Sequence, residues 1–168
     1  AQALRAAGAS VCLVARDAQK LESARQSLLT EIPGSAAVHT LSADVSQANQ
    51  IIPALRAFCA EVGAPDILVN NAGISMPGEF AQQPVEVFHQ LMEINYYGAV
   101  HTTHALLPAM QSRGSGYIVN ISSMAGFLGA YGYSAYGASK YALRGFSDVL
   151  RAELKQLGIK VSVVFPPD

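Results

Sequence analysis

The stretch GYIVNISS (residues 116–123) reads as a strand, SAYGASKYALRGFSDVLRAELKQLG (134–158) as a helix, and IKVSVVFPP (159–167) as a second strand. The two outer runs are short and apolar, which is typical of buried strands in a parallel sheet. The middle run is long and carries apolar residues at helical spacing. A strand, a crossover helix and another strand predict a parallel βαβ unit.

The same alternation extends back to the start of the chain. Gly8 is a helix C-terminal signal, Asp17 suits the N-cap of the following helix, and Pro53 is expected in the first turn of the helix after that. The expected helices cover residues 1–8, 17–29, 47–63 and 84–114, the last bent near Gly98, and the expected strands cover 10–15, 36–44 and 65–70. We therefore expect an α/β fold, a Rossmann-type doubly wound parallel sheet, as a single domain over residues 1–168.

Composition excludes several classes of function. Of the 168 residues, 51% are hydrophobic and 14% charged, which is too apolar for a disordered chain. The net charge is −1 and no basic stripe is present, so we expect no nucleic-acid partner. Cys12 and Cys59 lack metal-ligand spacing and read as small buried hydrophobes in a reducing compartment. His101 and His104 have no accompanying carboxylate or cysteine cluster, so no metal site is expected.

Tyr136 and Lys140 form the only Tyr-x-x-x-Lys pair in the chain. Residues four apart lie on one face of a helix. A free phenol is a poor proton donor at neutral pH, and a lysine ammonium one turn away favours the phenolate. The spacing alone also fits an ordinary pair on a helix surface, so the neighbouring residues must decide between the two readings.

Other polar residues follow or interrupt apolar segments. Ser123 ends the strand thirteen residues before Tyr136, and the NNAG turn (70–73) ends another strand. Ligands of parallel α/β sheets bind at the carboxyl ends of the strands. Asn95 lies in an apolar helical stretch, where it needs a partner and serves either as a structural hydrogen-bonder or as a relay.

These segments together resemble the short-chain dehydrogenase/reductase family. The segments that carry the resemblance span nearly the whole chain: GASVCLVARD, SADVS, ILVNNAGIS, INYYGAV, GYIVNISSMAG, YSAYGASKYAL and IKVSVVFPP. The resemblance implies a catalytic set of Asn95, Ser123, Tyr136 and Lys140. Tyr136 would be the acid/base, Lys140 would favour its phenolate and bind the nicotinamide ribose, Ser123 would bond the substrate carbonyl, and Asn95 would hold a relay water. Ser122 competes with Ser123, but the thirteen-residue spacing to the tyrosine favours Ser123.

The resemblance also implies a nicotinamide cofactor and a place for it. Ala15 stands where members that prefer NAD have an acidic residue, and Arg16 follows it. Since an arginine suits a 2′-phosphate, we expect NADP(H). A solvated loop arginine is the alternative. The further positions expected to bind the cofactor, besides Tyr136 and Lys140, are Asp44, Val45, Asn71, Ala72, Gly73 and Pro166.

The resemblance further implies that a first strand, its Gly-rich phosphate-binding turn and a C-terminal part of the family fold are absent from this chain. The ending FPPD, with Pro167 in place of the more frequent glycine, together with GFLGAYGYSAY and ALRGFSDVLRAEL, is most similar to the 3-ketodihydrosphingosine reductase branch. The uncharged segment 126–133 is expected to border the carbonyl site. We therefore expect reduction of a long-chain or hydrophobic ketone, such as 3-ketodihydrosphingosine.

Alternatives remain at this point. The chain could act on another small carbonyl or hydroxyl substrate, or be a non-catalytic dinucleotide sensor on the same fold. Family members commonly pair through the helices expected at 84–113 and 134–157, so we expect a homodimer or homotetramer. We expect a cytoplasmic location, or the cytosolic face of the endoplasmic reticulum membrane if a missing segment anchors the protein.

Overall fold

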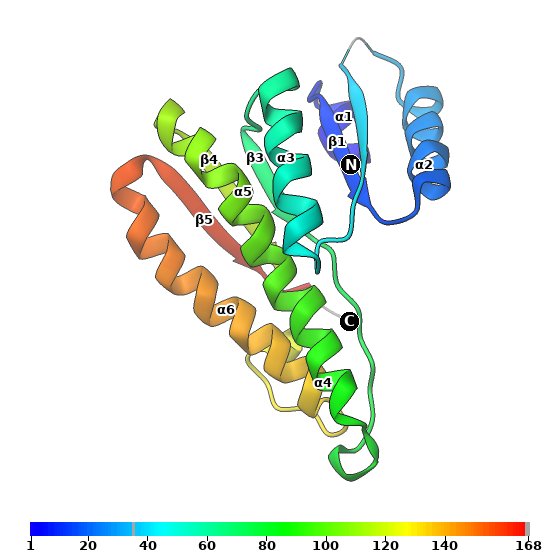
Figure 1. The fold of residues 1–168 in the computed structure, drawn as a ribbon, viewed down its shortest axis with the longest axis vertical. Coiled ribbons are helices and arrows are strands. Elements are labelled where there is room, and N and C mark those ends of the chain that lie inside the picture. Colours follow the sequence, from blue (N-terminus) through cyan, green and yellow to red (C-terminus); the bar gives the residue numbers. More distant parts are fainter. Residues whose placement is uncertain (35, 167–168) are drawn as a thin grey trace. The chain divides into compact units, whose positions relative to one another are not determined.

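The computed structural model describes residues 1–34 and 36–166 and divides the chain into two compact units. The first comprises residues Ala1–Asp44, and the second begins at Val45. Every strand pair in both units is parallel and the strands alternate with helices, which confirms the predicted α/β class (Figure 1). The single domain over residues 1–168 stays a prediction.

The first unit contains one pair of parallel strands and two helices. Its elements are α1 (Gln2–Ala6), β1 (Val11–Ala15), α2 (Ala18–Glu31) and β2 (Val38–Ser42). The strand register runs from Val11 opposite Val38 to Ala15 opposite Ser42. As predicted, Asp17 caps α2, because its carboxylate accepts from the backbone N–H groups of the first turn at 3.0 Å.

The second unit contains a three-stranded sheet in the order β3–β4–β5. Helices α3 and α5 lie side by side, and α6 runs along β5 (Figure 1). Its elements are α3 (Ala48–Val62), β3 (Ile67–Asn70), α4 (Val85–Met92), α5 (Gly98–Arg113), β4 (Gly116–Ile121), α6 (Ser134–Leu154) and β5 (Ile159–Val164), with short 3₁₀ turns at Phe80–Gln82, Met124–Gly126 and Lys155–Leu157. The predicted βαβ unit is thus β4, α6 and β5.

The core of this unit explains why α6 lies where it does. Buried apolar side chains from α5, β4, α6 and β5 meet in one cluster, formed by Met110, Ile118, Leu150, Leu154, Ile159 and Val161. Helix α6 contributes Leu150 and Leu154 to this cluster, so it is the C-terminal half of α6 that packs in the core. Its N-terminal half is thereby brought to the carboxyl ends of β3 and β4, where the polar residues singled out above are found.

The helix predicted over 84–114 contains a π-helical segment at Glu93–Tyr97, between α4 and α5. Gly98, near which the sequence predicted a bend, directly follows this segment and begins α5. A Cβ on Gly98 would lie 2.9 Å from a methyl carbon of Val45, so only glycine allows the helix to approach Val45 this closely. Single-turn π segments occur frequently at functional sites.

Two expectations are corrected. Pro53 is the sixth residue of α3 and does not lie in its first turn. The helix tolerates it because the carbonyl left without a donor belongs to Asn49, an exposed residue that water can reach. The short, continuous apolar run at residues 10–15 is also typical of a strand buried on both faces, and this expectation was wrong: within β1 only Val11 is buried, and the following residues are half-buried or exposed.

Candidate active site

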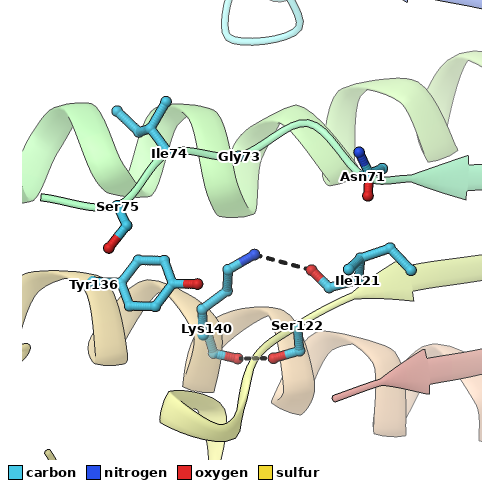
Figure 2. A pocket seen from close by; sticks show the side chains of 8 residues that line it. All are labelled: Asn71, Gly73, Ile74, Ser75, Ile121, Ser122, Tyr136 and Lys140. Carbon is cyan, nitrogen blue, oxygen red and sulfur yellow. Dashed lines mark hydrogen bonds between the residues drawn. The ribbon is translucent and has the colours of Figure 1, made fainter. Parts of the chain in front are cut away.

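A pocket of about 240 Å³ lies at the carboxyl ends of β3 and β4. Its lining comes from the turn after β3, the end of β4 and the first turns of α6 (Figure 2). The lining residues are Asn71, Gly73, Ile74, Ser75, Ile121, Ser122, Tyr136 and Lys140. The structure therefore places five of the predicted site residues on or beside one pocket: these are Asn71, Ala72, Gly73, Tyr136 and Lys140.

Tyr136 and Lys140 lie on the same face of α6, as their spacing predicts. The Lys140 ammonium is 5.8 Å from the centre of the Tyr136 ring, and the phenol oxygen points toward it (Figure 2). Lys140 is only 5% exposed, and its Nζ donates to the Ile121 carbonyl at 2.9 Å. Burial lowers the pKa of Lys140, so the ammonium gives up a proton more readily than an exposed lysine does.

The two adjacent serines have different hydrogen bonds. Ser122 donates its proton to the Lys140 carbonyl at 3.2 Å, and its side chain lines the pocket. Ser123 accepts from the Ala125 backbone N–H at 3.2 Å. Among the described residues no acceptor takes the Ser123 proton, so this hydroxyl remains able to donate to a ligand. The geometry fits the predicted role of Ser123, although the pocket lining includes Ser122 and not Ser123.

Asn95 is buried in the π-helical segment and clamps the turn after β3. Its Nδ2 donates to the Ile74 carbonyl at 2.9 Å, and its Oδ1 accepts from the Ile74 N–H at 2.8 Å. The second Nδ2 hydrogen goes to Ser139 at 3.0 Å. Asn95 is thus a structural hydrogen-bonder, and the relay water remains a prediction.

Gly73 stands between two members of the predicted catalytic set. A Cβ on Gly73 would lie 3.2 Å from the Asn95 Oδ1 and 3.5 Å from the Lys140 Nζ. The sequence suggested that this glycine admits a ligand. The structure adds that its missing side chain also leaves room for the Asn95 amide and the Lys140 ammonium.

The remaining predicted cofactor residues are not among those that line the pocket. In the first unit, an Arg16 side-chain nitrogen is 3.7 Å from a carboxylate oxygen of Asp44, and the Arg16 side chain is 67% exposed. In the second unit, the Val45 carbonyl is bonded to the His101 ring at 2.9 Å, and Pro166 follows β5 half-buried. Pro167, part of the predicted branch signature, lies outside the described residues.

Two contributors at the site were missed from the sequence. Ser139 bonds Asn95, and the Ile121 carbonyl holds Lys140. A backbone carbonyl has no sequence signature. Ser139 is adjacent to Lys140 in the chain, but a serine inside a helix gives no sign of its partner.

The family is decided by comparison with known proteins. The profile of the short chain dehydrogenase family matches residues 1–168. The chain belongs to the short-chain dehydrogenase family. Among the curated short-chain dehydrogenases, the 3-ketodihydrosphingosine reductase of Bos taurus is 40% identical over 163 residues, covering 96% of this chain and 49% of that protein. The dehydrogenase/reductase SDR family member 7B of Rattus norvegicus is 40% identical over 169 residues, covering 99% and 52%.

Solved short-chain dehydrogenases share the fold. A short-chain dehydrogenase from Streptomyces avermitilis superimposes with a TM-score of 0.89 at 38% identity, covering 98% of this chain and 59% of that one. A gluconate 5-dehydrogenase from Burkholderia cenocepacia, in complex with NADP and tartrate, gives a TM-score of 0.91 at 30% identity, covering 99% and 65%. These comparisons confirm the predicted family. They also confirm the predicted resemblance to the 3-ketodihydrosphingosine reductase branch.

The chain spans about half the length of the curated short-chain dehydrogenases that it matches. Among the described residues, none of the helices combines the length and the apolar character needed to cross a membrane.

Proposed function

We propose that the protein containing this chain reduces a ketone to an alcohol with NADPH, and that Tyr136 donates the proton. The observation that carries the proposal is the pairing of Tyr136 with the buried Lys140 in a pocket at the strand ends. When bound, the cofactor supplies the hydride that adds to the carbonyl carbon. Negative charge then develops on the carbonyl oxygen, where the hydroxyls of Tyr136 and Ser123 stabilise it.

The proton step follows from the positions of the side chains. Tyr136 transfers its hydroxyl proton to the oxygen of the forming alcohol and is left as a phenolate. The Lys140 ammonium favours that phenolate by its charge. Because one Lys140 N–H is bonded to the Ile121 carbonyl, the other two are left for the hydroxyls of a ribose.

The residues present fit a dinucleotide. Asn71, Ala72 and Gly73 are exposed beside the pocket, and the absent side chain of Gly73 lets a ligand approach the backbone. Preference for NADPH rests on Arg16, whose exposed guanidinium suits a 2′-phosphate. The gluconate 5-dehydrogenase with 30% identity is solved with NADP, which supports the same choice.

For the substrate we propose a long-chain or otherwise hydrophobic ketone, with 3-ketodihydrosphingosine first among the candidates. Leu128 is 52% exposed and Tyr131 85% exposed in the uncharged segment 126–133. The Gly132 carbonyl accepts from the Gly78 N–H at 2.8 Å, which brings this segment beside Phe80, itself 72% exposed. Such a surface stabilises a bound alkyl chain by about 25 cal/mol per Å² of apolar area buried. The bovine relative supports the named candidate.

Two alternatives are retained. The family member 7B relative is also 40% identical, so reduction of another small carbonyl, or oxidation of a hydroxyl, fits the sequence as well. Segment 126–133 could also pack against a neighbouring subunit. A non-catalytic sensor fits less well, because Asn95, Ser123, Tyr136 and Lys140 are all present and three of them are buried.

The test is turnover of the full-length protein with NADPH on saturated ketones that differ only in chain length. We expect kcat/KM to rise steeply from short to long chains and to rise less in Leu128→Ser. Flat kcat/KM values across the series would contradict the hydrophobic substrate. Absence of NADPH oxidation with every ketone would contradict the proposed reaction.

We also propose a homodimer or homotetramer. Tyr141 and Val149 are exposed apolar side chains on α6, in keeping with a helix that pairs with a copy of itself. Sedimentation of the full-length protein as a monomer at micromolar concentration would contradict this. The cytoplasmic location remains a prediction.

A further inference from the structure

Ser139 connects the π-helical segment Glu93–Tyr97 to the turn of α6 that carries the site. It is fully buried, at 0% exposure. Its hydroxyl donates to the Tyr136 carbonyl at 2.7 Å and accepts from the Asn95 Nδ2 at 3.0 Å. Because the Ser139 proton is used on a carbonyl, only the NH₂ side of the Asn95 amide can face it. Ser139 therefore supports the same orientation that the Ile74 N–H and carbonyl require, in which Asn95 Oδ1 faces the Ile74 N–H.

The same helix holds a second pair of this kind away from the pocket. Ser147 is also 0% exposed, donates to the Leu143 carbonyl at 2.7 Å and accepts from the Asn120 Nδ2 at 2.8 Å. The two serines thus match in burial, in chemistry and in their backbone partner one turn earlier. They differ in the asparagine: Asn120 belongs to strand β4, and Asn95 to the π-helical segment.

We propose that Ser139 is a positioning residue for the reaction. It fixes the Asn95 amide, and Asn95 in turn holds Ile74 and the turn that contains Gly73. The turn lines the pocket beside Lys140, and Gly73 leaves room for the Asn95 Oδ1 and the Lys140 Nζ. A loosened Asn95 amide lets this turn shift and misplaces the groups around Tyr136, and small misplacements of reacting groups are costly in rate.

The first experiment measures hydrogen–deuterium exchange in the full-length protein. Ser139→Ala removes the acceptor for Asn95, so we expect the Ile74 backbone amide to exchange at least about tenfold faster. The matched variant Ser147→Ala should leave Ile74 exchange unchanged. Ser139→Cys, which keeps the side-chain volume and weakens both hydrogen bonds, should behave as Ser139→Ala does and serves if the alanine variant does not fold. Unchanged Ile74 exchange in the Ser139 variants, or equal acceleration in Ser147→Ala, would overturn the proposal.

The second experiment is kinetic and rests on the proposed function. We expect Ser139→Ala to lower kcat about tenfold with NADPH affinity within about twofold of the wild type, and Ser147→Ala to keep kcat within about twofold. In an Asn95→Ala background, Ser139→Ala should change kcat by less than about twofold, because it acts through Asn95. Additive losses would overturn the proposal. An inactive wild-type protein would contradict the proposed reaction alone, since the exchange comparison still decides the role of Ser139.

Discussion

Two cations, one in each unit, differ in their exposure to solvent and in the partners of their charged groups. Arg16 in the first unit has a side chain that is 67% exposed and lies 3.7 Å from Asp44. Lys140 in the second unit is 5% exposed, and within the described chain its recorded hydrogen-bond partner is the neutral carbonyl of Ile121. An exposed ion pair contributes about 0–1 kcal/mol and is easily exchanged for a ligand. A buried ammonium retains a desolvation cost, which lowers the pKa of Lys140.

The difference teaches which part of the proposed function each cation can serve. An arginine that keeps its charge and its hydration can recognise a phosphate without a change in its own state. A lysine held in a pocket next to a phenol can alter a proton transfer. We therefore expect changes near Lys140 to affect turnover and changes at Arg16 to affect the choice of cofactor.

The largest expected effect is at the phenol. Tyr136→Phe removes the proton donor, so kcat should fall about 10²- to 10⁴-fold while NADPH affinity stays within about threefold. Tyr133 is the control, because its ring lies 5.7 Å from that of Tyr136 and Tyr133→Phe should keep kcat within about threefold. Steady-state kinetics and cofactor titration of the full-length protein measure both. Turnover of Tyr136→Phe within tenfold of the wild type would remove the proposed proton donor.

The second effect tests the other side of the comparison. Arg16→Ala should weaken NADPH binding about 10- to 100-fold and NADH binding less than about twofold, because only NADPH carries the 2′-phosphate. Lys20→Ala removes another exposed cation of the same unit and should leave both affinities unchanged. Equal losses for NADPH and NADH in Arg16→Ala would show that Arg16 does not read the phosphate.

The third effect tests the room around the buried cation. Gly73→Ala places a methyl group 3.2 Å from the Asn95 Oδ1, so the Asn95 amide must shift slightly, and 3.5 Å from the Lys140 Nζ, which is an ordinary contact. We expect kcat to fall about tenfold. Gly34→Ala adds a methyl group in open space and should leave kcat unchanged. If Gly73→Ala kept the wild-type kcat, the site would tolerate a methyl group beside Asn95 and Lys140.

The smallest expected effect is the pH dependence of stability. Because the pKa of Lys140 is lowered in the folded protein, the unfolded chain binds more protons between that value and 10.5. The Lys140 contribution to the free energy of unfolding therefore rises as pH increases through this window. Urea unfolding should show that the free energy of unfolding of the wild type, relative to that of Lys140→Met, is higher at pH 10 than at pH 7. A difference that moves the other way would argue against a desolvated amine.

Much of the site could be anticipated from short-range patterns. Tyr136 and Lys140 face one pocket because residues four apart share a helix face, and Asn71 and Gly73 reach it because both follow a strand. The choice between Ser122 and Ser123 rested on spacing alone. Their hydrogen bonds differ only because one hydroxyl reaches the Lys140 carbonyl and the other the Ala125 N–H.

The sequence by itself determined the α/β class, the parallel pairing, the cap at Asp17 and the family, because each follows from periodicity, local chemistry or motif order. Tertiary structure decided the π-helical form of Glu93–Tyr97, the half-buried state of β1 and the burial of Lys140 against a neutral carbonyl. It also decided that Asn95 is held by Ser139, 44 residues away in the chain. The physical reason is that hydrogen-bond partners and desolvation depend on which segments pack together, and a residue type does not specify its distant neighbours.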